Sequence, residues 1–489
     1  MLLDIAELED GFELSCEVAV VGAGAAGITV ARELARSRIE TVVLESGGIE
    51  PESETQDLYR GGSIGLPYPD LAATRLRYFG GTTNHWSGEL GSLDEHDFEA
   101  RPWFPDSGWP IARGELVPFY RRALSVCGAE SALDDAPGKA GEPLASERLR
   151  LAHRRRGVDA PLRFGAAYRS ALQQAPSLRL VLHANVVEIV VGGTRGVERL
   201  TVRALHGRTG SVRARSFVLA CGGIENARLL LAAAPGVVGA GADWLGRCFM
   251  DHPVHRPLRL LARPRIVAAL LRSTGGAVTW LPDLAPASGF QAQETIGSFG
   301  AELHEVPRAP GADGDAGSDA AWRLHEEVEG LRPAKSPPTL YELEIMQEQA
   351  PNRASRVTLA AERDALGVPR AALDYRHSAL DAHTARVAAT TVARELGRLG
   401  LGRVGLAGGF TPEGAEWDWP WRVAQHQLGT TRMASDPSRG ATDRDGRPFG
   451  VDNLFVAGGS LFPTVGYVNP TLTIVALALR LADRLKGAA

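Results

Sequence analysis

The stretch EVAVVGAGAAGITVARELARSRIETVVLES, residues 17–46, decides the fold of this chain. Its first five residues form the short apolar run that is expected of a strand buried on both faces. Gly22, Gly24 and Gly27 follow at once, and ITVARELARS then has helical spacing and good helix formers. A second apolar run leads to Glu45. A strand, a G-x-G-x-x-G turn, a helix, a strand and an acid within about 30 residues predict a dinucleotide-binding unit.

Each glycine of this turn has a physical role. Gly22 permits the tight turn, Gly24 lets the backbone approach a pyrophosphate, and Gly27 lets the helix pack closely on the strand. The start of the helix offers free N–H groups and a partial positive charge to that pyrophosphate. Glu45 would accept hydrogen bonds from the ribose hydroxyls. The motif by itself does not separate FAD from NAD.

Composition bounds the remaining possibilities. A length of 489 residues predicts two or three structural units, and 44% hydrophobic with 23% charged residues is ordinary globular usage. The formal net charge of −5 leaves no basic field to hold nucleic acid. The four cysteines show no C-x-x-C spacing, no run reaches about 18 apolar residues, and the N-terminus lacks a secretory pattern. We therefore expect a cytoplasmic protein without a disulfide scaffold, a membrane span or a metal site.

Two further segments combine glycine with polar residues. YFGGTTNHWSGEL, residues 78–90, is too polar and too rich in glycine for a core strand, so it predicts a loop that passes close to a ligand. Near the end of the chain, AQHQLGTTRM (424–433) precedes NLFVAGGS, which reads as a strand running into a glycine turn. PTLTIVALALRLADRL (470–485) predicts a long helix. His426 and Asn469 both lie beside these turns.

These segments and several internal blocks resemble the glucose–methanol–choline (GMC) flavoprotein oxidoreductases, and within them pyranose oxidases and related bacterial sugar oxidases. The blocks occur in family order. They are the fingerprint at 18–45, the GGTTNHW loop, HANVVEIVV (183–191), SFVLACGGIENARLLL (216–231), LGRCFMDHP (245–253), QEQAPNRASRVTLAAERDALGVPR (347–370) and the last 64 residues, 426–489.

The resemblance implies an α/β fold, in which a Rossmann-type FAD-binding domain is joined to a β-sheet substrate domain. The FAD domain would be discontinuous and would comprise residues 1–100, 180–255 and 426–489. The substrate domain would comprise residues 101–179 and 256–425.

The resemblance also implies the catalytic residues. His426 matches the histidine of the family's active-site pair, and Asn469 matches the second position, which holds His or Asn. His426 would act as general base, taking the hydroxyl proton while the carbinol C–H leaves as hydride to flavin N5. An unperturbed imidazole titrates near pH 6.5, so its neutral form is available at neutral pH. Asn469 would orient the hydroxyl by a hydrogen bond, although its place before Pro470 also suits a helix N-cap.

Contacts to FAD are implied by the same match. The implied residues are Gly22, Gly24, Gly27, Glu45, Gly80, Gly81, Thr82, Asn84, His85, Trp86, Val187 (with Val186 as the neighbouring candidate), Ala220, Gly222, Gly459, Pro470 and Thr471. In fungal pyranose oxidases the histidine of a T-H-W triplet is covalently bound to the flavin 8α-methyl group. Asn84 stands in place of that threonine, which favours stacking or hydrogen bonding by His85 over a covalent link and leaves the link open.

The segment GGFTPEGAEWDWPWRV (408–423), just before His426, predicts a loop at the substrate pocket. Flat aromatic faces suit sugar rings, and acids suit cationic substrate groups. The candidate substrate residues are Glu413, Glu416, Trp417 and Asp418. An ordinary surface loop that packs its tryptophans inward is the alternative. VPRAPGADGDAGSDAA (306–321), which is rich in Gly, Ala and Asp, predicts a mobile loop or lid.

The predicted function is FAD-dependent oxidation of a CH–OH group in a carbohydrate-like small molecule, with O₂ or another acceptor taking the electrons. The chain also resembles family members that oxidise the 6′-hydroxyl of an aminoglycoside intermediate to an aldehyde. A plain pyranose or glycoside alcohol is an equal candidate. Two other classes stay open, namely a non-redox FAD-containing lyase and a flavoprotein that only binds. No nucleic-acid or membrane partner is expected.

Overall fold

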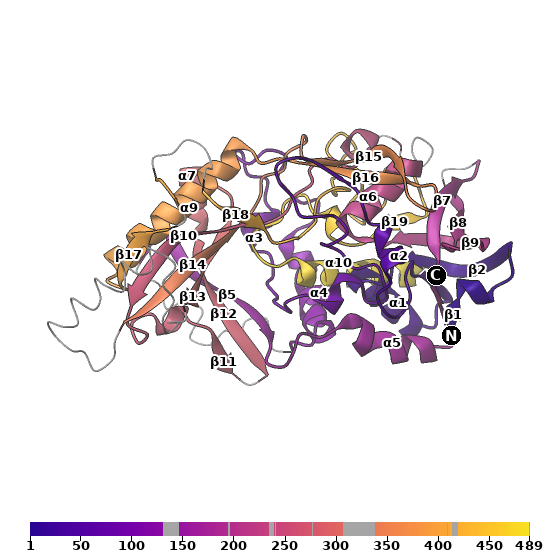
Figure 1. Ribbon diagram of the computed structural model, residues 1–489, viewed down its shortest axis with the longest axis horizontal. Coiled ribbons are helices and arrows are strands. Elements are labelled where there is room, and N and C mark those ends of the chain that lie inside the picture. Colours follow the sequence, from indigo (N-terminus) through magenta and orange to yellow (C-terminus); the bar gives the residue numbers. More distant parts are fainter. Residues whose placement is uncertain are drawn as a thin grey trace.

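The computed structural model describes residues 1–130, 146–193, 196–233, 239, 241–275, 277–306, 338–407, 409–412 and 419–488. The chain forms two lobes, each built around one large sheet, and both termini lie in the lobe of the first sheet (Figure 1). The predicted lid at 306–321 falls outside the described residues except for its first residue. Within the described residues, no helix combines the length and the apolar character that a bilayer crossing requires.

The first sheet has the order β1-β6-β3-β2-β9-β8-β7, with β19 beside β9. Its strands are β1 (Leu2–Asp4), β2 (Phe12–Val21), β3 (Thr41–Leu44), β6 (Leu178–Leu182), β7 (Asn185–Val191), β8 (Val197–Arg203), β9 (Thr209–Leu219) and β19 (Leu454–Val456). All pairs are parallel except β7–β8 and β8–β9. The predicted strand, glycine turn, helix and strand are confirmed, with α1 (Ala25–Arg36) joining β2 to β3.

Helices cover this sheet and complete its core. α10 (Thr471–Ala488) packs against α1 and α4 (Arg113–Val126), and α5 (Phe164–Gln174) also packs against α1. Val20, Leu116, Phe164 and Val475 belong to one buried cluster, and burying each such side chain contributes roughly 1.5–3 kcal/mol. The apolar faces of α4 and α5, which lie in the stretch 101–179, therefore belong to the core of the first lobe.

The second sheet is antiparallel and has the order β11-β12-β13-β14-β10-β17, with β5 beside β12 and β18 beside β10. Its strands are β5 (Leu149–Gly157), β10 (Pro253–Ala262), β11 (Ser273–Gly275), β12 (Val278–Pro286), β13 (Phe299–Glu305), β14 (Thr339–Gln347), β17 (Arg403–Leu406) and β18 (Trp421–Val423). Leu303 and Leu343 share a buried cluster with Ala388 of α9 (Ala379–Arg398). Because side chains alternate along a strand, Glu302 and Glu344 lie on the opposite face.

A third, small sheet links distant parts of the chain. It has the order β15-β16-β4, formed by β15 (Arg356–Arg363), β16 (Pro369–Tyr375) and β4 (Gly62–Gly65). α6 (Gly222–Ala233) packs against β15 and β16, next to the first sheet. Within the described residues, the remaining α-helices are the short α2 (Ser53–Asp57), α3 (Glu95–Phe98) and α7 (Ser288–Glu294).

Candidate active site

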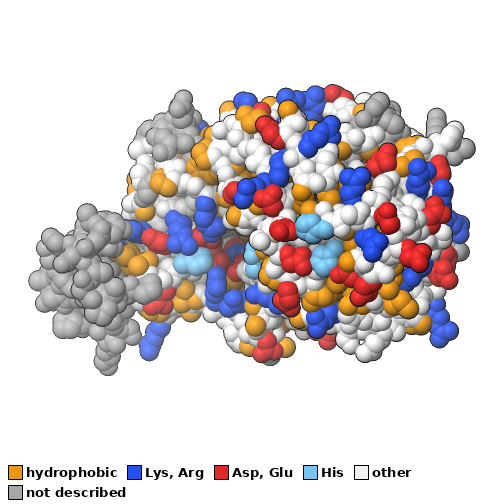
Figure 2. Space-filling view, turned by 45° about the vertical axis from the view of Figure 1, so that its right-hand side comes forward, with side chains coloured by type: hydrophobic (Ala, Val, Ile, Leu, Met, Phe, Trp, Pro, Cys, Tyr) orange, Lys and Arg blue, Asp and Glu red, His pale blue; other side chains and the backbone are white. Residues whose placement is uncertain are grey.

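A cavity of about 700 Å³ extends from the glycine turn after β2 to the inner face of the second sheet. Its walls come from both lobes, because the lining includes Gly22 and Gly24 as well as Glu302 and Glu344. Charged and histidine side chains crowd the recessed region between the lobes in the space-filling view (Figure 2). A volume of this size is typical of a site for a cofactor or small substrate.

The glycine turn forms one end of the cavity. A Cβ atom on Gly22 would lie 2.8 Å from the carbonyl oxygen of Ala220, and Gly22 has a φ of +94°. A Cβ on Gly27 would lie 1.8 Å from the carbonyl oxygen of Gly22, so the helix can approach the turn only with glycine there. A Cβ on Gly24 would meet no protein atom within 4 Å. The start of α1 also lacks a side-chain cap, which leaves its first N–H groups available to an anion.

Glu45 lies beside this turn at the end of β3. Its carboxylate accepts hydrogen bonds from the backbone N–H of Ala23 at 2.8 Å and of Gly47 at 2.9 Å, which fixes both oxygens and leaves lone pairs for hydroxyl donors. Arg77 lines the same end, and its buried Nε–H has no hydrogen-bond partner among the described residues. A glycine cradle, a fixed carboxylate and an unpaired donor fit the ribose and pyrophosphate of FAD.

Most residues that the sequence implied as FAD contacts line the cavity. They are Gly22, Gly24, Glu45, Gly81, Thr82, His85, Trp86, Ala220, Gly222, Gly459, Pro470 and Thr471. Gly27, Gly80, Asn84 and Val187 do not line it. Val186 lines it in place of Val187, which packs on the opposite side of β7 against the cluster of Leu58. Asn84 turns inward, where its amide donates to the carbonyl of Phe79 at 2.9 Å.

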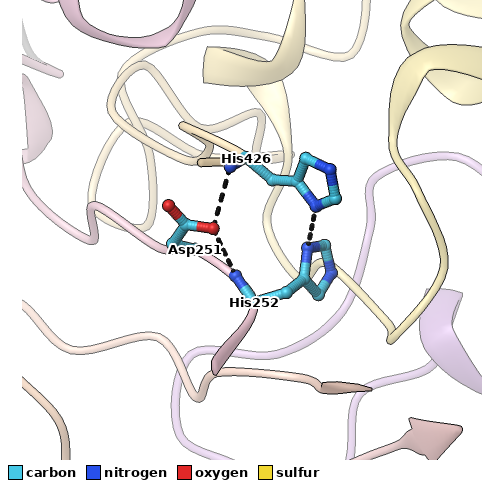
Figure 3. A group of neighbouring side chains, drawn as sticks. All are labelled: Asp251, His252 and His426. Atoms are coloured by element: carbon cyan, nitrogen blue, oxygen red, sulfur yellow. Dashed lines mark hydrogen bonds between the residues drawn. The ribbon is translucent and has the colours of Figure 1, made fainter. Parts of the chain in front are cut away.

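His426 and Asn469 line the same cavity. His426 follows β18, and the residue before it, Gln425, has a left-handed φ of +64°, which is uncommon for a residue other than glycine. One carboxylate oxygen of Asp251 accepts from the backbone N–H of His426 at 2.8 Å and of His252 at 2.7 Å (Figure 3). The other accepts from the hydroxyl of Tyr68 at 2.7 Å. Asp251 thereby holds the two histidines side by side.

The protons on the two rings follow from the acceptors around them. His252 is fully buried, and its Nε2 faces the carbonyl oxygen of Gly466 at 3.0 Å, so Nε2 carries a proton. Burial lowers the pKa of His252 to about 4, so the ring is neutral and its Nδ1 is bare. The Nδ1 of His426 lies 2.8 Å from that bare nitrogen and must donate to it (Figure 3). His426 therefore carries its proton on Nδ1, and its Nε2 is a free proton acceptor.

The electrostatic surroundings keep His426 uncharged. Burial first, then the neighbouring His252 ring, and then the positive charges of Arg154 and Arg422, hold the pKa of His426 well below its ordinary value of 6.5. The imidazole is therefore in its basic form across the neutral range.

Asn469 lies two residues before α10, which begins at Thr471. Its side-chain oxygen accepts from Nη1 of Arg154 at 3.1 Å. The residue is 9% exposed, and it borders the cavity. The structure thus places the Asn469 side chain at the cavity wall, where it can contact a ligand.

The end of the cavity beyond His426 is lined by charged side chains of the second sheet and its neighbours. They are Glu89, Arg154, Arg256, Arg272, Glu302, His304, Glu344 and Arg422. Glu302 and Glu344 are direct cross-strand partners on β13 and β14, and arginines flank both. Like charges opposite each other destabilise a sheet, so the arginines offset a repulsion that is built into this wall.

The predicted substrate residues Glu413, Glu416, Trp417 and Asp418 lie outside the described residues. The other two tryptophans of that segment pack inward. Trp419 is buried against Phe410, and its indole N–H donates to Nδ1 of His255 at 3.2 Å. Trp421 contacts Tyr375 and His377.

Several residues of this site were not identified from the sequence. Asp251 and His252 belong to the block 245–253, which resembles the family, but the resemblance did not indicate a role for either residue. Arg154 lies in the run HRRRG (153–157), which looks like an ordinary solvated basic stretch. Only its packing distinguishes it from its neighbours.

Comparisons with known proteins agree with this geometry. Residues 351–478 match the family model described as GMC oxidoreductase. The 6‴-hydroxyparomomycin C oxidase of Streptomyces lividus is 26% identical over 95% of this chain and 90% of its own length. The paromamine 6′-oxidase of Streptomyces fradiae is also 26% identical, over 96% and 91% respectively. The solved structure of pyridoxine 4-oxidase from Mesorbium loti has the same fold, with a TM-score of 0.60 and 17% identity over 96% of this chain and 99% of its own.

The family match identifies a GMC oxidoreductase domain at residues 351–478. Nearly the whole chain is similar to relatives that are named as oxidases, and its cavity joins a dinucleotide-type glycine turn to a neutral histidine.

Proposed function

We propose that this protein oxidises a CH–OH group of a sugar or amino-sugar glycoside to a carbonyl. The observation that carries the proposal is the bare Nε2 of His426, held at the cavity wall by a neutral His252 on its other side. When bound, FAD supplies the hydride acceptor at its N5 position. The chain's own part would be played by Nε2 of His426, which would take the hydroxyl proton of the alcohol.

The chain's own residues prepare each part of this reaction. The glycine turn, Glu45 and Arg77 would hold the cofactor, and His426 would take the proton. Once protonated, the imidazolium would still donate through Nδ1 to His252, so the ring keeps its orientation throughout. Asn469 would bind the substrate oxygen from a second direction.

The substrate class is supported by the wall beyond His426. Its carboxylates and guanidinium groups suit a ligand covered with hydroxyl or ammonium groups and are unfavourable for a long alkyl chain. The two Streptomyces relatives, which carry the names of aminoglycoside oxidases, align along nearly the whole chain. We therefore propose an amino-sugar alcohol, such as a 6′-hydroxyl, as the first candidate and a plain pyranoside as the second.

Anaerobic mixing tests this function. Purified protein would be mixed without oxygen with a neutral pyranoside, an amino-sugar pseudo-disaccharide and a simple alkanol, and the flavin absorbance near 450 nm followed. We expect bleaching by the sugar ligands and none by the alkanol. Return of the colour in air would separate an oxidase from a dehydrogenase. A protein that holds FAD but is bleached by none of them would contradict the proposal and favour a non-redox lyase.

We propose that FAD is held without a covalent bond. His85 is exposed and lines the cavity, and Asn84 replaces the threonine of the T-H-W triplet of covalently linked relatives. Acid precipitation should therefore release all the yellow colour into the supernatant. Colour that stays with the precipitated chain, and is lost in a His85→Ala variant, would demonstrate the covalent link instead.

The low pKa of His426 predicts a broad pH profile. A base whose pKa is lowered stays unprotonated to lower pH, so the acid limb of kcat/KM shifts below the ordinary histidine value. We expect kcat/KM to change less than about twofold between pH 6.5 and 8.5 and to fall only below that range. An acid limb centred at pH 6.5 or above would show that His426 is not the group that must be deprotonated.

A further inference from the structure

Arg154 of β5 has a fully hydrogen-bonded guanidinium group at the active site. Its guanidinium has five N–H donors, and each one meets an acceptor. Nε and Nη2 donate to the two oxygens of Asp283 at 2.8 and 3.0 Å, and Nη2 also donates to Glu302 at 2.8 Å. Nη1 donates to Glu89 at 2.7 Å and to the side-chain oxygen of Asn469 at 3.1 Å.

These partners come from separate parts of the chain. Asp283 lies on β12, Glu302 on β13, Glu89 in the loop after His85, and Asn469 before α10. The Arg154 side chain is only 6% exposed, and burial opposes its charge. The three carboxylates outweigh that effect and raise the pKa of the guanidinium further above its usual range. Arg154 is therefore a permanently charged, immobile group that connects the substrate-side sheet to the catalytic amide.

This contact decides how Asn469 meets a ligand. A guanidinium nitrogen can only donate, so the atom of Asn469 that faces Arg154 must be the carbonyl oxygen. The opposite assignment would place an NH₂ group against an N–H donor. Among the described residues the amide nitrogen has no hydrogen-bond partner, and it belongs to a residue that lines the cavity. Asn469 is thus left with N–H donors for a ligand.

We propose that Arg154 is a positioning residue, which holds the Asn469 amide so that its N–H group, and not its oxygen, faces the substrate hydroxyl. This inference rests on the proposed function, since it assigns a partner to the oxygen atom of the alcohol. His426 and Asn469 then have different tasks. His426 accepts the proton, and Asn469 donates a hydrogen bond to the oxygen as negative charge develops on it.

The magnitude of the effect follows from this geometry. A preoriented donor to a developing oxyanion is worth about 10²–10³-fold in rate, and the benefit depends on the donor being fixed before the reaction. An amide that can rotate presents its oxygen part of the time and repels the developing charge. Loss of the Arg154 contact should therefore lower the rate of the chemical step far more than the binding of the substrate.

The test uses the FAD-loaded enzyme and a double-mutant cycle. Arg154→Lys keeps the charge but cannot donate to all five acceptors. We expect it to slow flavin reduction at saturating substrate by about 10²-fold, with the substrate concentration for half-saturation changed less than about fivefold. Adding Asn469→Ala to the wild-type enzyme should slow flavin reduction by about 10²-fold. Adding it to the Arg154→Lys variant should slow flavin reduction by no more than about threefold. Equal factors in the two backgrounds would overturn the proposal.

Arg272 provides the matched control. It contacts the same carboxylates, at 2.6 Å from Glu302 and 4.0 Å from Glu89, and no contact to Asn469 is among those found for the described residues. Arg272→Met therefore perturbs the charge of the cluster without touching the amide. In the Arg272→Met background, Asn469→Ala should slow flavin reduction by the same factor as it does in the wild-type enzyme. If Asn469→Ala slowed flavin reduction by only about threefold in the Arg272→Met background as well, the role of Arg154 would be explained by its charge and not by its positioning of the amide.

A second variant remains informative if Arg154→Lys does not fold. Asn469→Asp keeps an oxygen for Arg154, so the buried pair is retained, but it replaces the N–H donor by an acceptor. We expect flavin reduction to slow at least as much as in Asn469→Ala. A rate within about tenfold of wild type would overturn the proposal, because the oxygen would then be the group that the substrate needs. If no alcohol reduces the flavin of wild type, the proposed function fails, and that outcome is distinct from either result of the variants.

Discussion

Replacing His426 by asparagine is expected to slow flavin reduction by about 10³-fold at pH 7.5 while the protein keeps its FAD. An asparagine amide nitrogen occupies nearly the position of the histidine Nδ1, so it can still donate to His252. The variant therefore removes the bare Nε2 and little else. Rapid anaerobic mixing with saturating substrate measures the rate, and the FAD content and thermal midpoint serve as controls for folding.

The pH dependence of this variant gives a second signature. Without a base on the protein, the proton must go to hydroxide or water, so the rate should rise as pH increases from 7 to 9.5. The rate of flavin reduction by the wild-type enzyme should not change with pH, because its base is already unprotonated throughout that range. A variant that loses less than about tenfold in rate, or that keeps a flat profile, would show that His426 is not the proton acceptor.

Replacing Gly27 by alanine is expected to prevent recovery of FAD-containing protein. The added Cβ would lie 1.8 Å from the carbonyl oxygen of Gly22, and a backbone atom cannot move away without opening the turn between β2 and α1. A clash of this kind lowers the free energy of unfolding by on the order of 4 kcal/mol or more, which is a large part of the total for a domain. The ratio of FAD to protein and the thermal unfolding of the soluble fraction measure the effect.

Gly24→Ala is the matched control for that experiment. A Cβ on Gly24 meets no protein atom within 4 Å and faces the cavity, so the fold of the apoprotein should tolerate it. Its unfolding midpoint without FAD should stay within about 2 °C of wild type, while FAD binds at least about tenfold more weakly. Folded, FAD-loaded Gly27→Ala would contradict the packing role of Gly27. Unchanged FAD affinity in Gly24→Ala would contradict a cofactor approach at Gly24.

The nucleotide-binding unit could be predicted from the sequence because all its signals are local. A buried strand, a glycine turn and an amphipathic helix each follow from neighbouring residues, and β2, α1 and β3 confirm them. Family resemblance identified His426 and Asn469, since both lie in segments that match the family pattern. The contribution of α4 and α5 to the first core was not foreseen, because the packing of an amphipathic helix depends on which surface is available to it.

By itself, the sequence determined the strand, the glycine turn and the helix around Gly22, Gly24 and Gly27, because only local backbone sterics are involved, and it predicts a dinucleotide at that turn. Through resemblance to a family, the sequence also predicts that His426 and Asn469 form the reactive pair, and both residues line the same cavity. Only the tertiary structure decided which nitrogen of His426 is bare and which atom of the Asn469 amide is bound to Arg154. Those properties depend on His252 and Arg154, which lie far away along the chain. A hydrogen bond across such a distance leaves no periodic pattern in the sequence, since any segment that folds nearby could supply the partner.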